Sequence, residues 1–235
     1  MAGLALVGGT GLLGSAFWSD ATPISVSTPY GDVTLLQQGG LFFLQRHGLE
    51  QYTPPHRINH HAHIHALQQV GAERVLAVGS VGSLRRDLPP GTLVVPDDFY
   101  APYLNLTFFT DQRGHRAPEF DPAWRATLLA AWSRTDLPPP RDSGIYWQTN
   151  GPRFETAAEI RILAPHVHLV GMTIASECIL AGELGLPYAA LCMVDNFANG
   201  IGTEKFSYAS FKAQVQANEP VLLRVIQGIV KELLG

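Results

Sequence analysis

Residues 4–14 are Leu-Ala-Leu-Val-Gly-Gly-Thr-Gly-Leu-Leu-Gly, a short apolar run followed by a glycine-rich turn. The apolar run predicts a first strand over residues 4–7. After such a strand, a glycine-rich turn can bring backbone N–H groups close to a phosphate group. The stretch therefore predicts the opening of an α/β fold, with an anion bound at its first turn.

The rest of the chain continues this alternation of strand and helix patterns. Short β-prone runs predict strands at residues 33–36, 41–45, 75–78, 92–96, 169–171 and 188–194. Helical patterns predict helices at residues 58–70, 122–133, 155–163, 176–184 and 206–234. This alternation is typical of an α/β fold with helices packed around a central sheet.

The composition is that of one globular domain. The chain has 235 residues, 46% of them hydrophobic and 15% charged, so it can bury a core without dividing in two. We therefore expect one domain over residues 1–235. Three prolines at residues 138–140 exclude a helix from residues 134–142, which we expect to form an exposed connection.

Charge and cysteine content indicate the surroundings of the protein. The net charge of −4 argues against a nucleic-acid or anionic-membrane surface, and no apolar run approaches the length of a membrane span. The N-terminus lacks the basic start of a signal peptide. Cys178 and Cys192 stand in apolar surroundings without metal-ligand spacing, which predicts reduced structural thiols and a cytoplasmic location.

Residues 9–14 match the GxGxxG pattern, which holds a pyrophosphate in dinucleotide-binding βαβ units. Pro23 interrupts the helix that such a unit needs, and Gly39-Gly40 indicates a hairpin where a second parallel strand should begin. A loop that holds a single anion with its amides and the Thr10 hydroxyl is favoured. A purely structural turn is the alternative.

Arg46 is the first candidate for an anion-binding side chain. It follows an apolar strand in the sequence Gln45-Arg46-His47-Gly48, so the strand end delivers it to the edge of the sheet. Its rigid fork of N–H donors matches a tetrahedral oxyanion better than a lysine does. A surface ion pair is the alternative role.

Residues 59–65 carry four histidines. His61 and His65 share a helix face, but no HExxH glutamate accompanies them, which argues against a metal site. Histidines on the helix surface are favoured, and contact of one histidine with a sugar is the alternative.

Several short motifs follow one another in the order found in one family. They are Gly8-Gly9-Thr10-Gly11, Arg46-His47-Gly48, the helix around Asn59, residues 79–84 (GSVGSL), residues 150–156 (NGPRFET), and Gly171-Met172-Thr173 with Glu177. In this order the chain resembles the trimeric purine nucleoside phosphorylases together with the methylthioadenosine and methylthioinosine phosphorylases. The likeness covers residue 4 to about residue 200. It implies a single α/β domain with a central mixed sheet, assembled as a homotrimer.

The resemblance also implies roles for individual residues. The positions implied to bind phosphate are Thr10, Arg46, His47, Thr173 and, through its backbone, Ser80. Met172 is implied to pack against the ribose and Phe154 against the base. Glu155 and Asn196 are implied to hydrogen-bond to the base. Residues 103–109 are implied to complete the site of a neighbouring subunit.

Two positions depart from the family pattern. Ser176 stands where a proline usually precedes the acid at Glu177. Gly79 stands where many members have threonine or asparagine, so one hydroxyl or amide contact to phosphate is missing.

The residues implied for the base favour a 6-oxopurine. Adenine-specific members have an aspartate at the position of Asn196, whereas an amide donates to N7 and adapts to O6. An ionised Glu155 accepts from N1–H, which adenine lacks. Asp195 keeps adenine open as an alternative, because a shift of one residue would bring its carboxylate to the base. The structural alternatives are a helix cap for Glu155 and a turn for Asn196.

The implied reaction is phosphorolysis of a purine nucleoside, such as inosine, guanosine or 5′-methylthioinosine, to the base and a pentose 1-phosphate. Bond cleavage places positive charge on the ribose and negative charge on the purine. We expect Arg46 to hold the attacking phosphate and Asn196 to stabilise the leaving base, so both are candidate catalytic residues. The reaction needs no metal and no organic cofactor, since phosphate is a co-substrate.

Other functions stay open as alternatives. A 5′-methylthioadenosine phosphorylase or a nucleosidase would share the fold, although a nucleosidase would not need Thr10 and Arg46 together. A dinucleotide-binding reductase and a non-catalytic purine-binding module belong to other classes. The 5′ group is undecided between hydroxyl and methylthio, because Phe206, Tyr208 and Phe211 fit an apolar 5′ pocket or the core face of the last helix.

Overall fold

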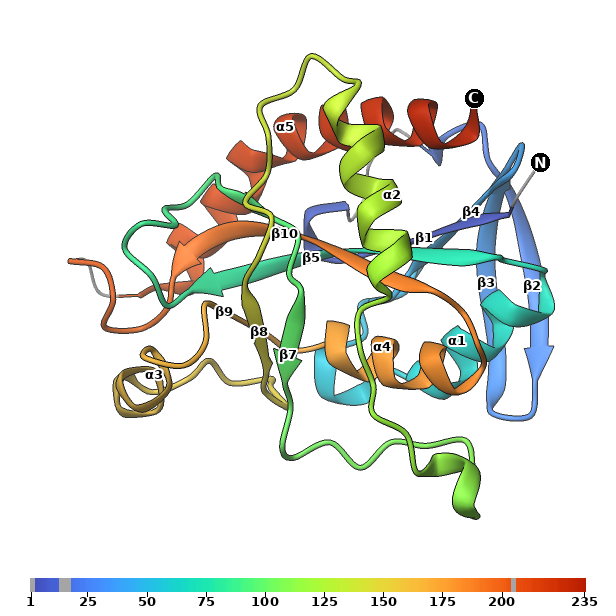
Figure 1. The fold of residues 1–235 in the computed structure, drawn as a ribbon, viewed down its shortest axis with the longest axis horizontal. Coiled ribbons are helices and arrows are strands. Elements are labelled where there is room, and N and C mark those ends of the chain that lie inside the picture. The colour runs from blue at the N-terminus through green and yellow to red at the C-terminus, as the bar shows by residue number, and fades with distance from the viewer. Residues whose placement is uncertain (1–2, 13–17, 204–205) are drawn as a thin grey trace.

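The computed structural model describes residues 3–12, 18–203 and 206–235 (Figure 1). Leu13 and Gly14, the last two positions of the GxGxxG motif, lie outside the described residues. The strands are β1 (Leu4–Gly8), β2 (Thr22–Thr28), β3 (Gly31–Gln38), β4 (Leu41–Gln45), β5 (Arg74–Ser83), β6 (Leu93–Val94), β7 (Asp98–Tyr100), β8 (Ile145–Gln148), β9 (Leu169–Gly171) and β10 (Tyr188–Phe197). The α-helices are α1 (His60–Gln69), α2 (Pro122–Ser133), α3 (Ala157–Leu163), α4 (Ile174–Glu183) and α5 (Tyr208–Leu234).

The strands form one mixed sheet, which confirms the predicted α/β class. The order is β2-β3-β4-β1-β5-β9-β8-β7, and β10 pairs with β5 and β6. β1 runs parallel to β4 and β5, and β10 runs parallel to β5. β9 is antiparallel to β5 and parallel to β8.

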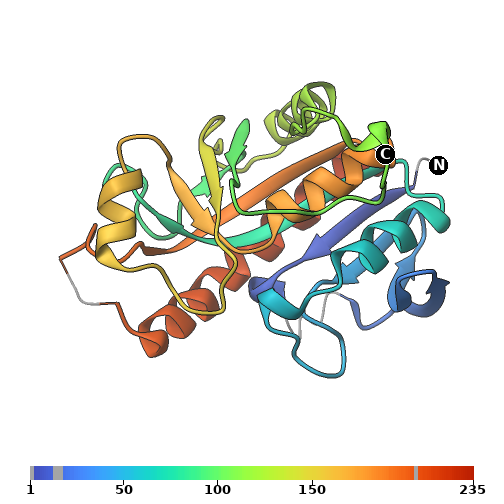
Figure 2. The ribbon, with the colours of Figure 1, turned by 90° about the horizontal axis from the view of Figure 1, so that it is seen from below.

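Helices cover both faces of the sheet (Figures 1 and 2). In β1, Leu4 and Leu6 belong to the core cluster that includes residues of α2 and α5. Ala5 and Val7 belong to the cluster that includes residues of α1 and α4. Because successive side chains of a strand point to opposite faces, an unbroken apolar run is what a sheet covered on both sides requires. Among the described helices, none is long and apolar enough to cross a membrane.

A notch opens in the sheet along one edge of β5. On the other edge β10 pairs with β5 from end to end. On the notched edge, β1 pairs only as far as Ala77, and β9 pairs only with Gly82 and Ser83. The edge of β5 at residues 78–81 is therefore open, and β1 and β9 end on either side of it. Ligands of α/β sheets commonly bind beyond the carboxyl ends of strands, so this notch is the expected place for a site.

The predicted strands and helices are present, with shifts at their ends. The hairpin at Gly39-Gly40 is confirmed, since β3 and β4 are antiparallel and Gly39 has a φ of 59°. Residues 134–142 contain no helix, as predicted. Strands β2, β7 and β8 are additional to the prediction. β2 contains Pro23 but lies at the edge of the sheet, where a missing N–H is tolerated.

Candidate active site

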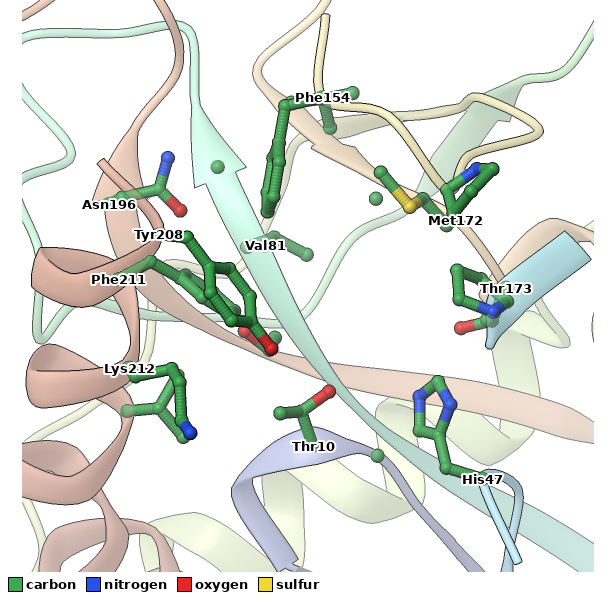
Figure 3. Close-up of a pocket in the computed structure, with 18 of the residues that line it drawn as sticks. Thr10, His47, Val81, Phe154, Met172, Thr173, Asn196, Tyr208, Phe211 and Lys212 are labelled. Atoms are coloured by element: carbon green, nitrogen blue, oxygen red, sulfur yellow. The ribbon is translucent and has the colours of Figure 1, made fainter. Parts of the chain in front are cut away.

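A cavity of about 600 Å³ lies in the notch. The turn after β1, the ends of β4 and β9, the loop after β8 and the first part of α5 enclose it (Figure 3). Its lining includes all the residues implied to bind phosphate, ribose and base, namely Thr10, Arg46, His47, Ser80, Phe154, Glu155, Met172, Thr173 and Asn196. The fold thus brings to one cavity residues that are far apart in the sequence.

The turn after β1 carries Thr10 to one end of the cavity. A Cβ atom on Gly9 would lie 2.7 Å from Nη1 of Arg46 and 2.9 Å from the carbonyl oxygen of Val78, so no side chain fits there. The turn continues as a 3₁₀ helix over Thr10–Leu12. The next strands, β2 and β3, are antiparallel, unlike those of a dinucleotide-binding unit. The geometry therefore favours a site for one anion.

Arg46 is held by a buried ion pair. Its Nε and Nη2 atoms donate to Oε1 and Oε2 of Glu177 at 2.6 and 2.9 Å, and Nη1 donates to the carbonyl of Val78 at 2.6 Å. The hydroxyl of Tyr188 donates to Oε2 of Glu177 at 2.7 Å. Arg46 is 1% exposed and Glu177 is fully buried. A buried guanidinium and carboxylate are stable only when paired, which explains this arrangement.

The ion pair corrects the prediction for Arg46 in one respect. The edge of the guanidinium that carries Nε and Nη2 faces Glu177 and not the cavity. The alternative role, a surface ion pair, is wrong in its location, because this ion pair is buried. Burial acts to lower the pKa of Arg46, but the Glu177 carboxylate raises it above its ordinary value. Burial acts to raise the pKa of Glu177, but Arg46 holds it below its ordinary value. A guanidinium has five N–H groups, so two remain for a ligand in the cavity that Arg46 lines.

Thr173 stands at the N-terminus of α4 and lines the same end of the cavity. Its side chain makes no capping hydrogen bond. The hydroxyl of Tyr146 accepts instead from the N–H groups of Thr173 and Ile174, at 3.3 and 3.4 Å. The Thr173 hydroxyl can therefore turn to a ligand, and the positive end of the helix dipole favours an anion there.

His47 faces this end of the cavity as a neutral side chain (Figure 3). Its Nδ1 lies 2.8 Å from the carbonyl oxygen of Thr53, which only accepts, so Nδ1 carries the proton. The ring stacks on Tyr52 with a centroid distance of 5.3 Å. Burial lowers the pKa of His47 to about 4. Near neutral pH its Nε2 atom is thus a hydrogen-bond acceptor.

Both departures from the family pattern have a structural explanation. A Cβ atom at Gly79 would lie 2.5 Å from Cδ1 of Ile174, so the Ile174 side chain occupies the space that a larger residue at position 79 would need. The N–H of Ser176 donates to Oε1 of Gln148 at 3.0 Å, and Nε2 of Gln148 donates to the Ser176 hydroxyl at 2.6 Å. A proline at position 176 could make neither bond.

Phe154 and Asn196 lie on the other side of the cavity (Figure 3), and Glu155 also lines it. The carboxylate of Glu155 accepts from the hydroxyl of Thr149 at 2.7 Å, and burial raises its pKa. The helix-cap role for Glu155 is wrong. Thr156 caps α3, because its side chain accepts from the N–H of Glu159, while the Glu159 carboxylate accepts from the N–H of Thr156.

Asn196, and not Asp195, lines the cavity. The pairing of β10 with β5 shifts register between Val194 and Asn196, which leaves Asp195 in a bulge. The two oxygens of Asp195 accept from the Ser80 hydroxyl and, at 2.7 Å, from Nδ2 of Asn218. The side chain of Asp195 is therefore engaged behind the cavity wall, and it is 2% exposed.

Aromatic side chains from the start of α5 form the remaining wall. The ring of Phe154 lies 4.3 Å from that of Phe206 and 5.7 Å from that of Phe211, between centroids. Tyr208 is 61% exposed and lines the cavity with Phe211, so these residues are not the core face of the helix. Phe206, Tyr208 and Phe211 thus contribute to the cavity, whereas residues 204–205 lie outside the described part of the chain.

The histidines of α1 do not line the cavity. The surface interpretation is wrong for His60, which is 7% exposed, and burial lowers the pKa of both His60 and His63 to about 4. Within the described residues no group of three or more His, Cys, Asp or Glu side chains is placed to hold a metal. Residues 103–109 lie against α1 and α4, where the carbonyl of Thr107 contacts His61 and the Glu183 carboxylate accepts from the N–H of Phe108.

Sequence reasoning missed two sets of residues. The polar wall of α5, formed by Lys212, Gln216 and Glu219, was detectable from its helical spacing of four and three residues. The supporting network behind the cavity, which includes Tyr146, Tyr188 and Asn218, carries no local signal in the sequence.

Comparison with known proteins agrees with this geometry. A family model described as the phosphorylase superfamily matches residues 6–231. The chain belongs to this family. It is 35% identical to a protein of Archaeoglobus fulgidus named probable 6-oxopurine nucleoside phosphorylase, over 98% of this chain and 96% of that protein. It is 33% identical to a protein of Methanocaldococcus jannaschii named probable S-methyl-5′-thioinosine phosphorylase, over 99% and 93% of the two chains.

A solved structure shares the fold over almost the whole chain. It is the methylthioadenosine phosphorylase of Schistosoma mansoni in complex with tubercidin, with a TM-score of 0.82 and 26% identity. The match covers 99% of this chain and 92% of the other. The likeness inferred from short motifs up to about residue 200 therefore extends through α5.

Proposed function

We propose that this protein is a purine nucleoside phosphorylase that uses phosphate to cleave 6-oxopurine nucleosides. The observation that carries the proposal is the division of one cavity into two ends. Thr10, His47 and Thr173 lie on one side of the cavity and Phe154 and Asn196 on the other (Figure 3), and Arg46, Ser80 and Glu155 also line it. A nucleoside that spans the cavity would present its glycosidic bond to a phosphate bound between them.

The first end suits a phosphate that still carries a proton. Arg46 supplies positive charge and N–H groups, and Thr173 adds a hydroxyl beside a helix N-terminus. His47 offers an acceptor at Nε2, which pairs with a P–OH group. These residues would hold the phosphate as nucleophile and, by its charge, stabilise the cationic ribose in the transition state. Met172, which lines the cavity, would pack against the ribose.

The second end suits a 6-oxopurine. The amide of Asn196 uses one N–H in a 2.8 Å bond to the carbonyl of Phe197, and its other N–H and its oxygen can serve N7 and O6. The Glu155 carboxylate, oriented by Thr149, would accept from N1–H. Because Asp195 is engaged elsewhere, the adenine alternative has lost its main support.

The second candidate substrate is 5′-methylthioinosine. Phe206, Tyr208, Phe211 and Val215 give the α5 side of the cavity an apolar part on which a thioether would be stable. Lys212 and Gln216 give it a polar part that suits a 5′-hydroxyl. Both substrate types share the base and phosphate chemistry described above.

Further properties follow from the same proposal. The reaction needs no metal or organic cofactor. We propose that the protein acts in the cytoplasm in purine salvage, as a homotrimer in which residues 103–109 reach a neighbouring site. Tyr103 is 77% exposed, which suits a subunit contact.

The test is release of free base from inosine, guanosine, 5′-methylthioinosine, adenosine and 5′-methylthioadenosine, each with and without phosphate. We expect turnover of the 6-oxopurine nucleosides only when phosphate is present. Turnover without phosphate would identify a nucleosidase, and preference for the adenine nucleosides would overturn the role given to Asn196. The ratio of inosine turnover to 5′-methylthioinosine turnover decides whether the preferred substrate carries a 5′-hydroxyl or a 5′-methylthio group.

A further inference from the structure

A chain of hydrogen bonds runs behind the cavity and joins three elements. The Ser80 hydroxyl on β5 donates to Oδ2 of Asp195 on β10, and Nδ2 of Asn218 on α5 donates to Oδ1 of the same carboxylate at 2.7 Å. Asp195 and Asn218 are 2% and 7% exposed. Neither lines the main cavity, whereas Ser80 does.

The carboxylate takes the place of a missing backbone contact. Val194 pairs with Val81 and Asn196 pairs with Gly82, so Asp195 is the extra residue of a bulge and has no partner in the ladder. Its side chain reaches β5 at Ser80 instead. The bond therefore fixes the bulge that turns Asn196 toward the cavity, and it also fixes Ser80 at the phosphate end.

The same chain connects α5 to the strands. Asn218 also donates to the carbonyl of Val194 at 3.3 Å, and its oxygen accepts from Nε2 of Gln214 at 3.0 Å, so its amide has one orientation. Among the described residues, the other hydrogen bonds from α5 to a distant element are those of Glu232 with Arg134, near the far end of the helix. Asn218 is thus the polar attachment of the half of α5 that lines the cavity.

An aspartate at this place is costly for stability. Burial raises the pKa of Asp195, and its hydrogen-bond donors are an uncharged hydroxyl and an uncharged amide. A carboxylate nevertheless has what the place requires, because its two oxygens accept from two elements at once. A role in arranging the site accounts for its presence better than a role in stability does.

We propose that Asp195 and Asn218 are positioning residues, which set the phosphate end through Ser80 and the base end through the bulge at Asn196. This inference rests on the proposed function. It assigns to α5 a part in aligning phosphate and base, in addition to forming the 5′ wall.

The test is a double-mutant cycle of Ser80→Ala and Asn218→Ala, with the KM for phosphate and kcat measured at saturating nucleoside. We expect each single variant to raise the KM for phosphate about two- to tenfold, the range of one ordinary hydrogen bond. The double variant should match the worse single variant, because both changes break one chain. Multiplied effects in the double variant would overturn the inference.

Val225→Ala is the matched control. Val225 lies on the buried face of the same helix, and its truncation leaves a void without breaking any of these hydrogen bonds. We expect Val225→Ala to lower the Tm and to leave the KM for phosphate within about twofold of that of the unmodified protein. An equal rise in KM for Val225→Ala and Asn218→Ala would mean that Asn218 acts only through helix stability. Phosphate-independent turnover by the unmodified protein would instead contradict the proposed function itself.

Discussion

In the proposed reaction, Asn196 stabilises the negative charge that develops on the departing purine. Its amide is oriented by the bond to the carbonyl of Phe197, so little rearrangement is needed when the base leaves. We predict that Asn196→Ala lowers kcat about 10²- to 10³-fold with a smaller change in KM, as removal of one such donor does in comparable sites. Steady-state kinetics with the preferred nucleoside measure both constants.

Asn199→Ala is the control for this prediction. Asn199 also lines the cavity, but its amide donates to the backbone carbonyl of Glu155 at 3.4 Å. We expect its kcat to fall less than about tenfold, in keeping with loss of one long bond. Equal kcat for Asn196→Ala and the unmodified protein would remove Asn196 from the mechanism.

Glu177 is the residue on which the orientation of Arg46 depends. We predict that Glu177→Gln lowers the free energy of unfolding by about 3–5 kcal/mol, because it leaves a buried guanidinium without its counter-charge. Denaturant titration measures the loss. Glu232→Gln, which breaks the more exposed pair with Arg134, should cost at most about 1 kcal/mol. Similar losses in the two variants would contradict the importance given to burial.

At the scale of elements, the start of α3 positions Glu155, the proposed contact to the base. The capping box of Thr156 and Glu159 fixes the first turn of α3, and Glu155 immediately precedes it. We predict that Thr156→Ala lowers the free energy of unfolding by about 1 kcal/mol and raises the KM for the nucleoside. The reason is that the backbone at Glu155, just before the helix, is no longer held in place by the cap. Thermal unfolding and kinetics together test this.

Asp121→Ala provides the comparison for the cap. Asp121 caps α2 by accepting from the N–H of Trp124, and it does not line the cavity. Its loss should also cost about 1 kcal/mol but leave the KM unchanged. A raised KM in both variants would mean that general loosening, and not the position of Glu155, is responsible.

For the whole molecule, buried neutral histidines link stability to pH. Burial lowers the pKa of His47, His60 and His63 to about 4, whereas the unfolded value is about 6.5. Between these values the unfolded chain binds protons that the folded chain does not. The free energy of unfolding should therefore fall as the pH is lowered from 6.5 toward 4, by up to about 1.4 kcal/mol per pH unit for each histidine.

Denaturant titrations between pH 7.5 and 5 measure this dependence. His60→Gln should reduce the slope, because its proton uptake on unfolding is removed. His56→Gln, at an exposed position, should leave the slope unchanged. A slope that is the same for both variants would show that His60 does not contribute.

Much of the fold and of the site follows from local sequence patterns. Apolar runs such as residues 4–7 predict buried strands, and caps and prolines set helix ends such as that of α2 at Asp121 and Pro122. Pro23 concealed β2, because a proline argues against a strand unless the strand lies at an edge, and edge position is a property of the whole sheet.

By itself the sequence determined the α/β class, the order of the motifs and the residues expected to bind phosphate, ribose and base, all of which line the cavity. Tertiary structure decided how those residues are used. Arg46 pairs with the carboxylate of Glu177, 131 positions away in the sequence. A bulge in β10 against β5 turns Asp195 toward Asn218 and Asn196 toward the cavity. The physical reason is that buried charges and hydrogen-bonding groups must find partners, and the nearest partner in space is often remote in sequence.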